Sequence, residues 1–158
     1  MGLRKILTDK EPSLHKVCRE VVNFDSKLHK LLEDMTETLI DSGGVGLAAP
    51  QVGILRRVVL VDTGEEILEL VNPELLETDG EQVGAEGCLS VPGKYGLVKR
   101  PYYAKVRAQD RYGDWYEAEG EEIIARCFCH ELDHLDGILY TQIMDRYMTD
   151  EELSADEE

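Results

Sequence analysis

Residues 26–41 carry apolar side chains at the spacing of one helix face, namely Leu28, Leu31, Leu32, Met35 and Leu39. Asp25 or Ser26 can cap the start of this helix, and the pair Gly43 and Gly44 can end it. The pattern therefore predicts an amphipathic helix in the N-terminal part of the chain, with one buried stripe.

Later segments alternate apolar and polar residues as β-strands do. Residues 54–62 and 66–74 are predicted to be single strands, and residues 103–120 a hairpin. A second helical pattern covers residues 121–136, with acidic residues in its first turn, where they favour the helix dipole, and Gly137 just after its end. The predicted class is α+β, with mainly antiparallel strands packed around this central helix.

The length and charge of the chain restrict the classes of molecule that it is expected to bind. Its 158 residues suit one domain, and 33 acidic residues against 17 basic ones give a formal net charge of −16. Such a surface repels nucleic acid and anionic membranes, so direct binding of either is not expected. No apolar run approaches the ~20 residues of a membrane span, and residues 1–16 lack the features of a signal or transit peptide. The expected location is the cytoplasm.

Residues 148–158 are expected to form a separate acidic tail. The last nine residues of the chain hold six acidic side chains and almost nothing to bury. A segment of this composition cannot offset the entropy lost on ordering, so the tail is predicted to be disordered. Residues 1–147 then form the folded domain.

The stretch CFCHELDHLDG, residues 127–137, concentrates side chains that bind metals. His130 and His134 are four residues apart, so both imidazoles project from one helix face and can share a tetrahedral ion. Glu131 lies about 100° further round the helix, where its carboxylate can reach water at the metal without being a ligand. Two ordinary histidines with polar neighbours are the alternative, but the H-E-x-x-H pattern favours a metallohydrolase site.

The third ligand is expected from another segment. Cys129 and Asp133 point off the histidine face, and Asp136 lies at the frayed helix end, although either carboxylate could hydrogen-bond a ligand imidazole. Cys127 shares the face, but a third ligand from the same helix would strain a tetrahedral site, so it is more natural as apolar lining. Taken alone, Cys88 is more often expected to be a buried core thiol. Beside a histidine helix that still lacks a ligand, it becomes the better candidate, and the glycine before it lets the backbone come close to a neighbour.

Residues 43–53, GGVGLAAPQVG, contain a formal G-x-G-x-x-A dinucleotide fingerprint. The context contradicts nucleotide binding, because the motif follows a helix and Pro50 interrupts any helix after it. We interpret the segment as a loop that exposes its backbone before the next strand. Gln51 in this loop offers both an amide donor and an acceptor.

Three motifs occur in order along the chain: GVGLAAPQ at 44–51, EGCLS at 86–90 and HELDH at 130–134. Together they resemble the signature motifs of the bacterial peptide deformylase family, and the similarity extends from about residue 3 to residue 147. The resemblance implies an α+β metalloenzyme, with residues 1–147 as its catalytic domain. It also implies removal of the formyl group from the N-terminal formyl-methionine of newly made proteins, with release of formate. N-formyl-methionyl nascent polypeptides are then the partners, with transient proximity to the ribosome.

The resemblance assigns roles by position. The metal ligands it implies are Cys88, His130 and His134. The catalytic groups are Glu131 as acid/base, with the Gln51 side chain and the Leu89 backbone N–H as oxyanion donors. The substrate contacts are the Gly46 carbonyl, Arg100 beside the bound peptide, and methionine-pocket residues Val45, Glu86, Leu89, Ile123 and Cys127.

The implied cofactor is one divalent metal ion per chain, with Fe(II) in the cell. A thiolate and two imidazoles are also compatible with Zn(II), Ni(II) or Co(II), so ligand type alone does not choose. Two rival functions remain at this point, an HExxH endopeptidase and a metal-dependent binding domain without catalysis. The cysteine in place of a third His or Glu argues against the first, and Glu131 argues against the second.

Two features depart from the family pattern. Cys129 stands just before His130, where many members have glutamine, so a second thiol is expected near the metal. The acidic tail argues against docking on RNA through the C-terminus.

Overall fold

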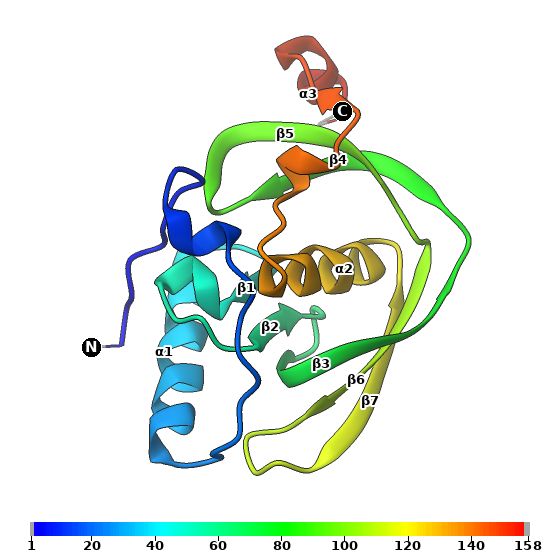
Figure 1. Ribbon diagram of the computed structural model, residues 1–158. Coiled ribbons are helices and arrows are strands. Elements are labelled where there is room, and N and C mark those ends of the chain that lie inside the picture. The colour runs from blue at the N-terminus through cyan, green and yellow to red at the C-terminus, as the bar shows by residue number, and fades with distance from the viewer. Residues whose placement is uncertain (1, 157–158) are drawn as a thin grey trace.

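Two antiparallel sheets surround a central helix in the computed structural model, which describes residues 2–156 (Figure 1). The elements in chain order are η1 (Pro12–His15), α1 (Ser26–Ser42), β1 (Gly46–Ala48), η2 (Ala49–Val52), β2 (Val58–Asp62), β3 (Ile67–Asp79), β4 (Gln82–Cys88), β5 (Val91–Arg100), β6 (Tyr103–Gln109), β7 (Trp115–Glu121), α2 (Ile123–Leu135), η3 (Tyr140–Gln142), β8 (Arg146–Tyr147) and α3 (Asp150–Asp156). The protein is therefore α+β, as the sequence predicts.

The sheets differ in size and place. The larger one has the order β1-β2-β3-β6-β7, and the smaller one has the order β4-β5-β8. Every strand pair in both sheets is antiparallel. Strands β1 and β4 each stand at one end of their sheet, so each has a free edge. Helix α2 crosses the middle of the molecule and packs on the larger sheet (Figure 1).

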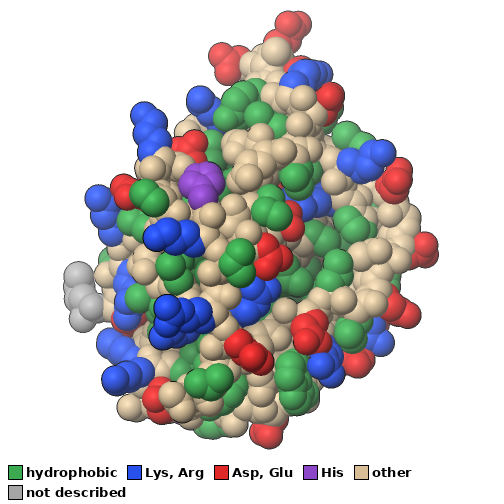
Figure 2. Space-filling view, in the orientation of Figure 1, with side chains coloured by type: hydrophobic (Ala, Val, Ile, Leu, Met, Phe, Trp, Pro, Cys, Tyr) green, Lys and Arg blue, Asp and Glu red, His purple; other side chains and the backbone are tan. Residues whose placement is uncertain are grey.

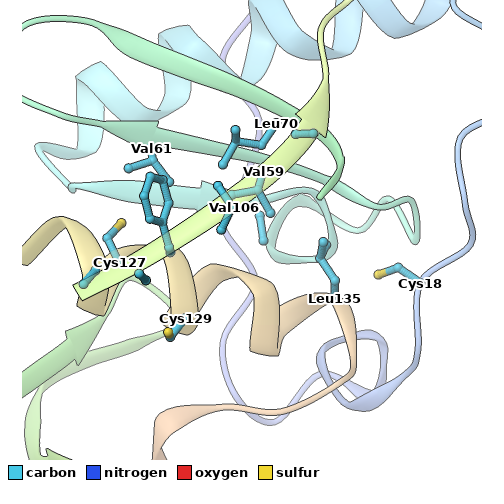
Figure 3. Close-up of a cluster of buried hydrophobic side chains, with 13 residues drawn as sticks. Cys18, Val59, Val61, Leu70, Val106, Cys127, Cys129 and Leu135 are labelled. Carbon is cyan, nitrogen blue, oxygen red and sulfur yellow. The ribbon is translucent and has the colours of Figure 1, made fainter. Parts of the chain in front are cut away.

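The main core lies between α2 and the larger sheet. Figure 3 shows apolar side chains from the strands meeting those of the helix, with labelled residues Val59, Val61, Leu70, Val106, Cys127, Cys129 and Leu135. Phe128 of α2 is completely buried in the same cluster. Truncating such a side chain to alanine typically costs about 3–5 kcal/mol, so this packing fixes the position of α2 firmly.

Helix α1 closes a second core. The carboxylate of Asp25 accepts a hydrogen bond from the Leu28 N–H at the first turn, and Gly43 ends the helix in the left-handed conformation with φ of 71°. The buried residues of its stripe include Leu28, Leu31, Leu32, Met35 and Leu39. They pack against Leu47, Val58, Leu60 and Val71 of the larger sheet.

Some boundaries differ from the sequence expectation. Strand β2 begins only at Val58, because Arg56 instead forms an isolated parallel bridge with Arg19. The expected acidic first turn of α2 is wrong, since Glu121 still pairs with Tyr103 in the sheet and the chain turns sharply at Glu122, with φ of 56°.

The C-terminal segment also differs, because residues 150–156 form helix α3 where disorder was predicted. A capping box explains the helix: the Thr149 hydroxyl accepts from the Glu152 N–H, and the Glu152 carboxylate accepts from the Thr149 N–H. Arg146 adds an ion pair to Glu152 at 2.7 Å. Residues 157–158 of the predicted tail lie outside the described residues.

Charge is not spread evenly over this acidic chain. Residues 4–27 together with Arg56 and Arg57 hold eight of the basic residues and only four acidic ones. Figure 2 shows Lys and Arg side chains gathered on the left of this face, while Asp and Glu side chains lie mainly along its right and lower margins. The net charge of −16 therefore does not describe every face of the molecule.

Within residues 2–156, no helix is both long and apolar enough to cross a membrane.

Candidate metal centre and its cleft

The two histidines of helix α2 lie on its inner face. Their ring centroids are 4.9 Å apart, and His130 and His134 keep only 7% and 0% of their surface exposed. Burial lowers the pKa of His134 and so favours the neutral imidazole that a metal ion requires. Burial alone would also lower the pKa of His130, but its interactions with Cys88 and Glu86 outweigh burial and raise it.

The third member of the cluster comes from the other sheet. Cys88 ends strand β4, and its Sγ lies 3.3 Å from His134 Nε2. The Sγ of Cys88 and one ring nitrogen from each histidine all lie within 4.8 Å of one another, the only such group of potential ligands within residues 2–156. One thiolate and two imidazoles form a donor set suited to zinc, iron, nickel or cobalt, so the residues present fit a transition-metal ion.

Glu86 orients the first histidine. Its Oε2 accepts a hydrogen bond of 2.6 Å from His130 Nδ1, and both of its oxygens accept from Arg100 at 3.0 and 2.7 Å. Arg126 donates a further bond of 3.0 Å. Burial would raise the pKa of Glu86, but the bonds from His130 and Arg100 outweigh it and lower the pKa to about 2. The carboxylate is thus ionised and fixes the ring of His130.

This network corrects two expectations. The sequence offered Asp133 or Asp136 as the partner of a ligand imidazole, but these carboxylates pair with Arg100 at 2.7 Å and Arg57 at 3.1 Å. Arg100 does not line the cleft, although it was expected beside the bound peptide. Its guanidinium forms ion pairs with Glu86 and Asp133, and the Arg100 side chain is 6% exposed.

Glu131 is buried beside the cluster without belonging to it. Burial raises the pKa of its carboxyl group to about 7. Its Oε1 has no hydrogen-bond partner among residues 2–156. A Cβ at Gly46 would lie 2.5 Å from Glu131 Oε2 and 2.7 Å from Cys127 Sγ, so only glycine lets β1 approach this carboxylate so closely. An oxygen that is free to exchange a proton therefore lies next to the candidate metal site.

Gln51 reaches the cluster from the short helix η2. The Ala48 N–H donates to Gln51 Oε1 at 2.9 Å, which fixes the orientation of the amide. The Nε2 group then lies 3.1 Å from Ser90 Oγ and 3.6 Å from Cys88 Sγ. The side chain is 1% exposed, so its amide N–H donors point at the centre from a rigid position.

These groups border a cavity of about 510 Å³. The predicted site residues that line it are Val45, Gly46, Gln51, Glu86, Cys88, Leu89, Ile123, Cys127, His130 and Glu131. His134 is fully buried, so the cavity ends at the candidate metal cluster without exposing this potential ligand. Glu86 meets the cavity, but its carboxylate is engaged by His130 and the arginines.

The two other thiols near the histidines are core residues. Burial raises the pKa of both Cys127 and Cys129, which disfavours the thiolate that a metal would bind. Both belong to the cluster between α2 and the sheet, and Figure 3 shows their side chains on the helix. Neither belongs to the group of potential ligands described above.

Sequence reasoning missed three residues around the centre. Ser90 binds the Gln51 amide, Arg126 binds Glu86, and Tyr95 lines the cavity. Arg126 shares the helix of the histidines and lies four residues before His130, so helical spacing could have placed it on their side. The positions of Ser90 and Tyr95 depend on the turn between β4 and β5, and the sequence pattern does not predict the conformation of this turn.

The arrangement is suited to activating a water molecule for nucleophilic attack on the carbon of a polarised carbonyl group. It combines three potential ligands, a buried carboxylate with a raised pKa and a fixed amide donor, all at the end of one cavity. Such a set is suited to hydrolysis with general acid–base catalysis.

Comparison with known proteins agrees with this chemistry. The family model described as polypeptide deformylase matches residues 3–149. The peptide deformylase of Agathobacter rectalis is 56% identical over 142 residues, which cover 90% of this chain and 90% of that protein. Crystal structures of peptide deformylases from Legionella pneumophila and Thermotoga maritima both have a TM-score of 0.88 to this fold. The Legionella protein is 41% identical to this chain, and the match covers 90% of this chain and 86% of that one. The Thermotoga protein is 40% identical, and the match covers 90% of this chain and 98% of that one. The chain belongs to the polypeptide deformylase family.

Proposed function

We propose that Cys88, His130 and His134 hold the metal ion of this deformylase and that Glu131 moves the proton during catalysis. The enzyme removes the formyl group from the N-terminal formyl-methionine of newly synthesised proteins and releases formate. The observation that carries the residue assignment is the free Oε1 of Glu131, a buried carboxylate oxygen beside the three potential ligands.

The metal ion, when bound, supplies Lewis acidity that polarises the formyl carbonyl and makes water a stronger nucleophile. We propose Fe(II) as the ion in the cell. The soft thiolate of Cys88 also suits zinc, nickel or cobalt, so elemental analysis after anaerobic purification is the measurement that identifies the native ion.

Glu131 serves as base and then as acid. It accepts a proton from the attacking water, whose oxygen forms a bond to the formyl carbon. It then delivers that proton to the methionine nitrogen as the C–N bond breaks, which leaves formate and a free amine. A carboxyl group with a pKa of about 7 suits both transfers near neutral pH.

The carbonyl oxygen gains negative charge during attack and needs donors. We assign this role to Gln51 Nε2, held toward Cys88 Sγ, and to the backbone N–H of Leu89, the residue after that ligand. Because the amide of Gln51 is already oriented by Ala48, little reorganisation is needed when the charge develops.

The substrate backbone fits between two free strand edges. Gly46 of β1 and residues 85–88 of β4 line the same cavity, and each strand ends its sheet. An extended peptide can add to such edges through main-chain hydrogen bonds, including one to the Gly46 carbonyl. The methionine side chain is assigned to the apolar lining formed by Val45, Leu89, Ile123 and Cys127.

The substrate defines the setting of the enzyme. N-formyl-methionyl chains are made on ribosomes, so we propose a cytoplasmic enzyme that meets nascent polypeptides close to the ribosome. Residues 1–147 are proposed as its catalytic domain. Helix α3 lies outside this domain, and no role in catalysis is assigned to it.

The test is formate release from formyl-Met-Ala-Ser by anaerobically purified protein. Glu131→Ala should keep the metal ion and the fold but lose about 10²–10⁴-fold in turnover. Asp136→Ala is the matched control, because this exposed carboxylate at the end of α2 pairs with Arg57 away from the cavity, and its turnover should equal that of the parent. Near-parental turnover in Glu131→Ala would overturn the acid/base assignment. Loss of metal in that variant would show that the glutamate helps to hold the ion.

A further inference from the structure

Three large apolar side chains are exposed at the border of the catalytic cavity. Val45, Tyr95 and Ile123 are 39%, 45% and 60% exposed, and all three line the cavity. They come from three separate segments: the loop before β1, strand β5 and the start of α2. Val45 and Ile123 are already assigned to the methionine side chain, so Tyr95 is the exposed apolar side chain of the three that is available to a further apolar group of the substrate.

Tyr95 holds its ring against the strand that carries a metal ligand. A Cβ at Gly87 would lie 2.6 and 2.8 Å from two carbons of the Tyr95 ring, so the ring packs directly on the backbone beside Cys88. The glycine is therefore required for this contact. The ring is fixed on one side by Gly87, and 45% of the side chain remains exposed.

The neighbouring lysine is directed elsewhere. Lys94 also lines the cavity, but its ammonium group lies 5.0 Å from the centre of the Tyr147 ring on β8. Glu86, Arg126 and Glu131 are the other charged residues of the lining, and all three are buried. The exposed face of the Tyr95 ring is therefore an aromatic surface. The carboxylates of the cavity lining are buried, so none of them competes for this face.

We propose that Tyr95 is a specificity-determining residue that stacks on an aromatic side chain of the substrate, at one of the two positions after methionine. This inference rests on the proposed function and extends it from the formyl-methionine end to the residues that follow. An extended chain that leaves the centre along β4 passes Gly87, where the ring packs. An aromatic pair in contact gains attraction beyond burial alone, whereas a small polar side chain gains none of it.

The experiment compares kcat and KM for formyl-Met-Ala-Ser, formyl-Met-Phe-Ser and formyl-Met-Ala-Phe, together with their leucine counterparts. Phenylalanine at one of the two positions should raise kcat/KM by about 2- to 13-fold, the range expected for one aromatic pair, mainly through KM. Tyr95→Ala should abolish this difference in kcat/KM between the phenylalanine and alanine peptides, and Tyr95→Phe should keep it. Tyr95→Leu retains bulk over Gly87 and should lose the preference for phenylalanine over leucine.

Tyr112→Ala is the control, because this exposed tyrosine lies at the β6–β7 turn away from the cavity. Its peptide ratios should match those of the parent. A parent without the aromatic preference, or Tyr95→Ala and Tyr95→Leu variants that retain it, would overturn the inference while leaving deformylation intact. Absence of formate from every peptide would instead reject the proposed function and this inference with it.

Discussion

Replacing Glu86 with glutamine tests the network that holds His130, one of the proposed histidine ligands. The carboxylate binds His130, Arg100 and Arg126, and its pKa is lowered from 4.5 to about 2. A pKa lowered by that amount corresponds to roughly 3 kcal/mol of stability at neutral pH. Glutamine keeps the shape but removes the charge. We therefore expect Glu86→Gln to lower the free energy of unfolding by about 3 kcal/mol at pH 7.

The sign of the pH dependence gives a second readout. Because the pKa is lower in the folded state, the stability from Glu86 is fully present above the unfolded-state value of 4.5 and is lost as the pH falls through about 2. The difference between parent and Glu86→Gln should therefore shrink between about pH 5 and pH 2. Urea unfolding of chelator-treated protein, followed across this range, measures it without any contribution from metal binding.

The same variant should also weaken metal binding. Without a carboxylate at Nδ1, the ring of His130 loses its fixed orientation, and metal affinity should fall about 10- to 100-fold. Glu81→Gln is the control, since Glu81 is exposed and forms only a loose pair of 3.8 Å with Lys99; its stability should stay within about 0.5 kcal/mol of the parent. A Glu86→Gln protein with the stability and metal affinity of the parent would refute the reasoning.

Three further predictions concern the centre and the tail. Cys88→Ala should lose the metal ion by elemental analysis, while Cys127→Ala and Cys129→Ala keep it; full occupancy in Cys88→Ala would reject the ligand assignment. Gly46→Ala should reduce kcat about 10²-fold with the fold retained, because the added methyl group displaces the Glu131 carboxylate; unchanged kcat would mean that this approach is unimportant. Removing residues 150–158 should leave formate release from a short peptide unchanged, since an exposed ion pair such as Arg146 with Glu152 contributes at most about 1 kcal/mol; a several-fold loss of kcat/KM would contradict this.

Local patterns predicted much of the site. The helical spacing of His130 and His134 places them on one face wherever the helix lies, and the alternation around residues 103–120 gives the β6–β7 hairpin directly. The sequence indicates Cys88 as a candidate because a metal site with two histidines needs a further ligand, and the structure places its Sγ with the two imidazoles. None of these inferences required knowledge of the register between distant strands.

The partners of Glu86 could not be predicted in the same way. Glu86 faces Gly96 in the β4–β5 ladder, so whether its carboxylate meets Arg100 depends on the register and on the position of α2. Helix α3 was missed for a different reason. The T-x-x-E capping box at Thr149 and Glu152 is visible in the sequence, but the acidic composition of the segment predicts disorder and does not reveal that this local motif outweighs it.

The two free strand edges beside the centre have a consequence for the behaviour of the folded protein. A free edge usually invites pairing with any extended chain, and long flat edges promote aggregation. Here β1 is only three residues long, and β4 contains Gly84 and Gly87, so neither presents a long apolar template. Both edges border the cavity, where the proposed pairing would bring a chain end to the candidate metal centre. Main-chain pairing ignores side-chain identity, so under the proposed binding mode the property that elsewhere causes misassembly would let one enzyme accept chains of different sequence.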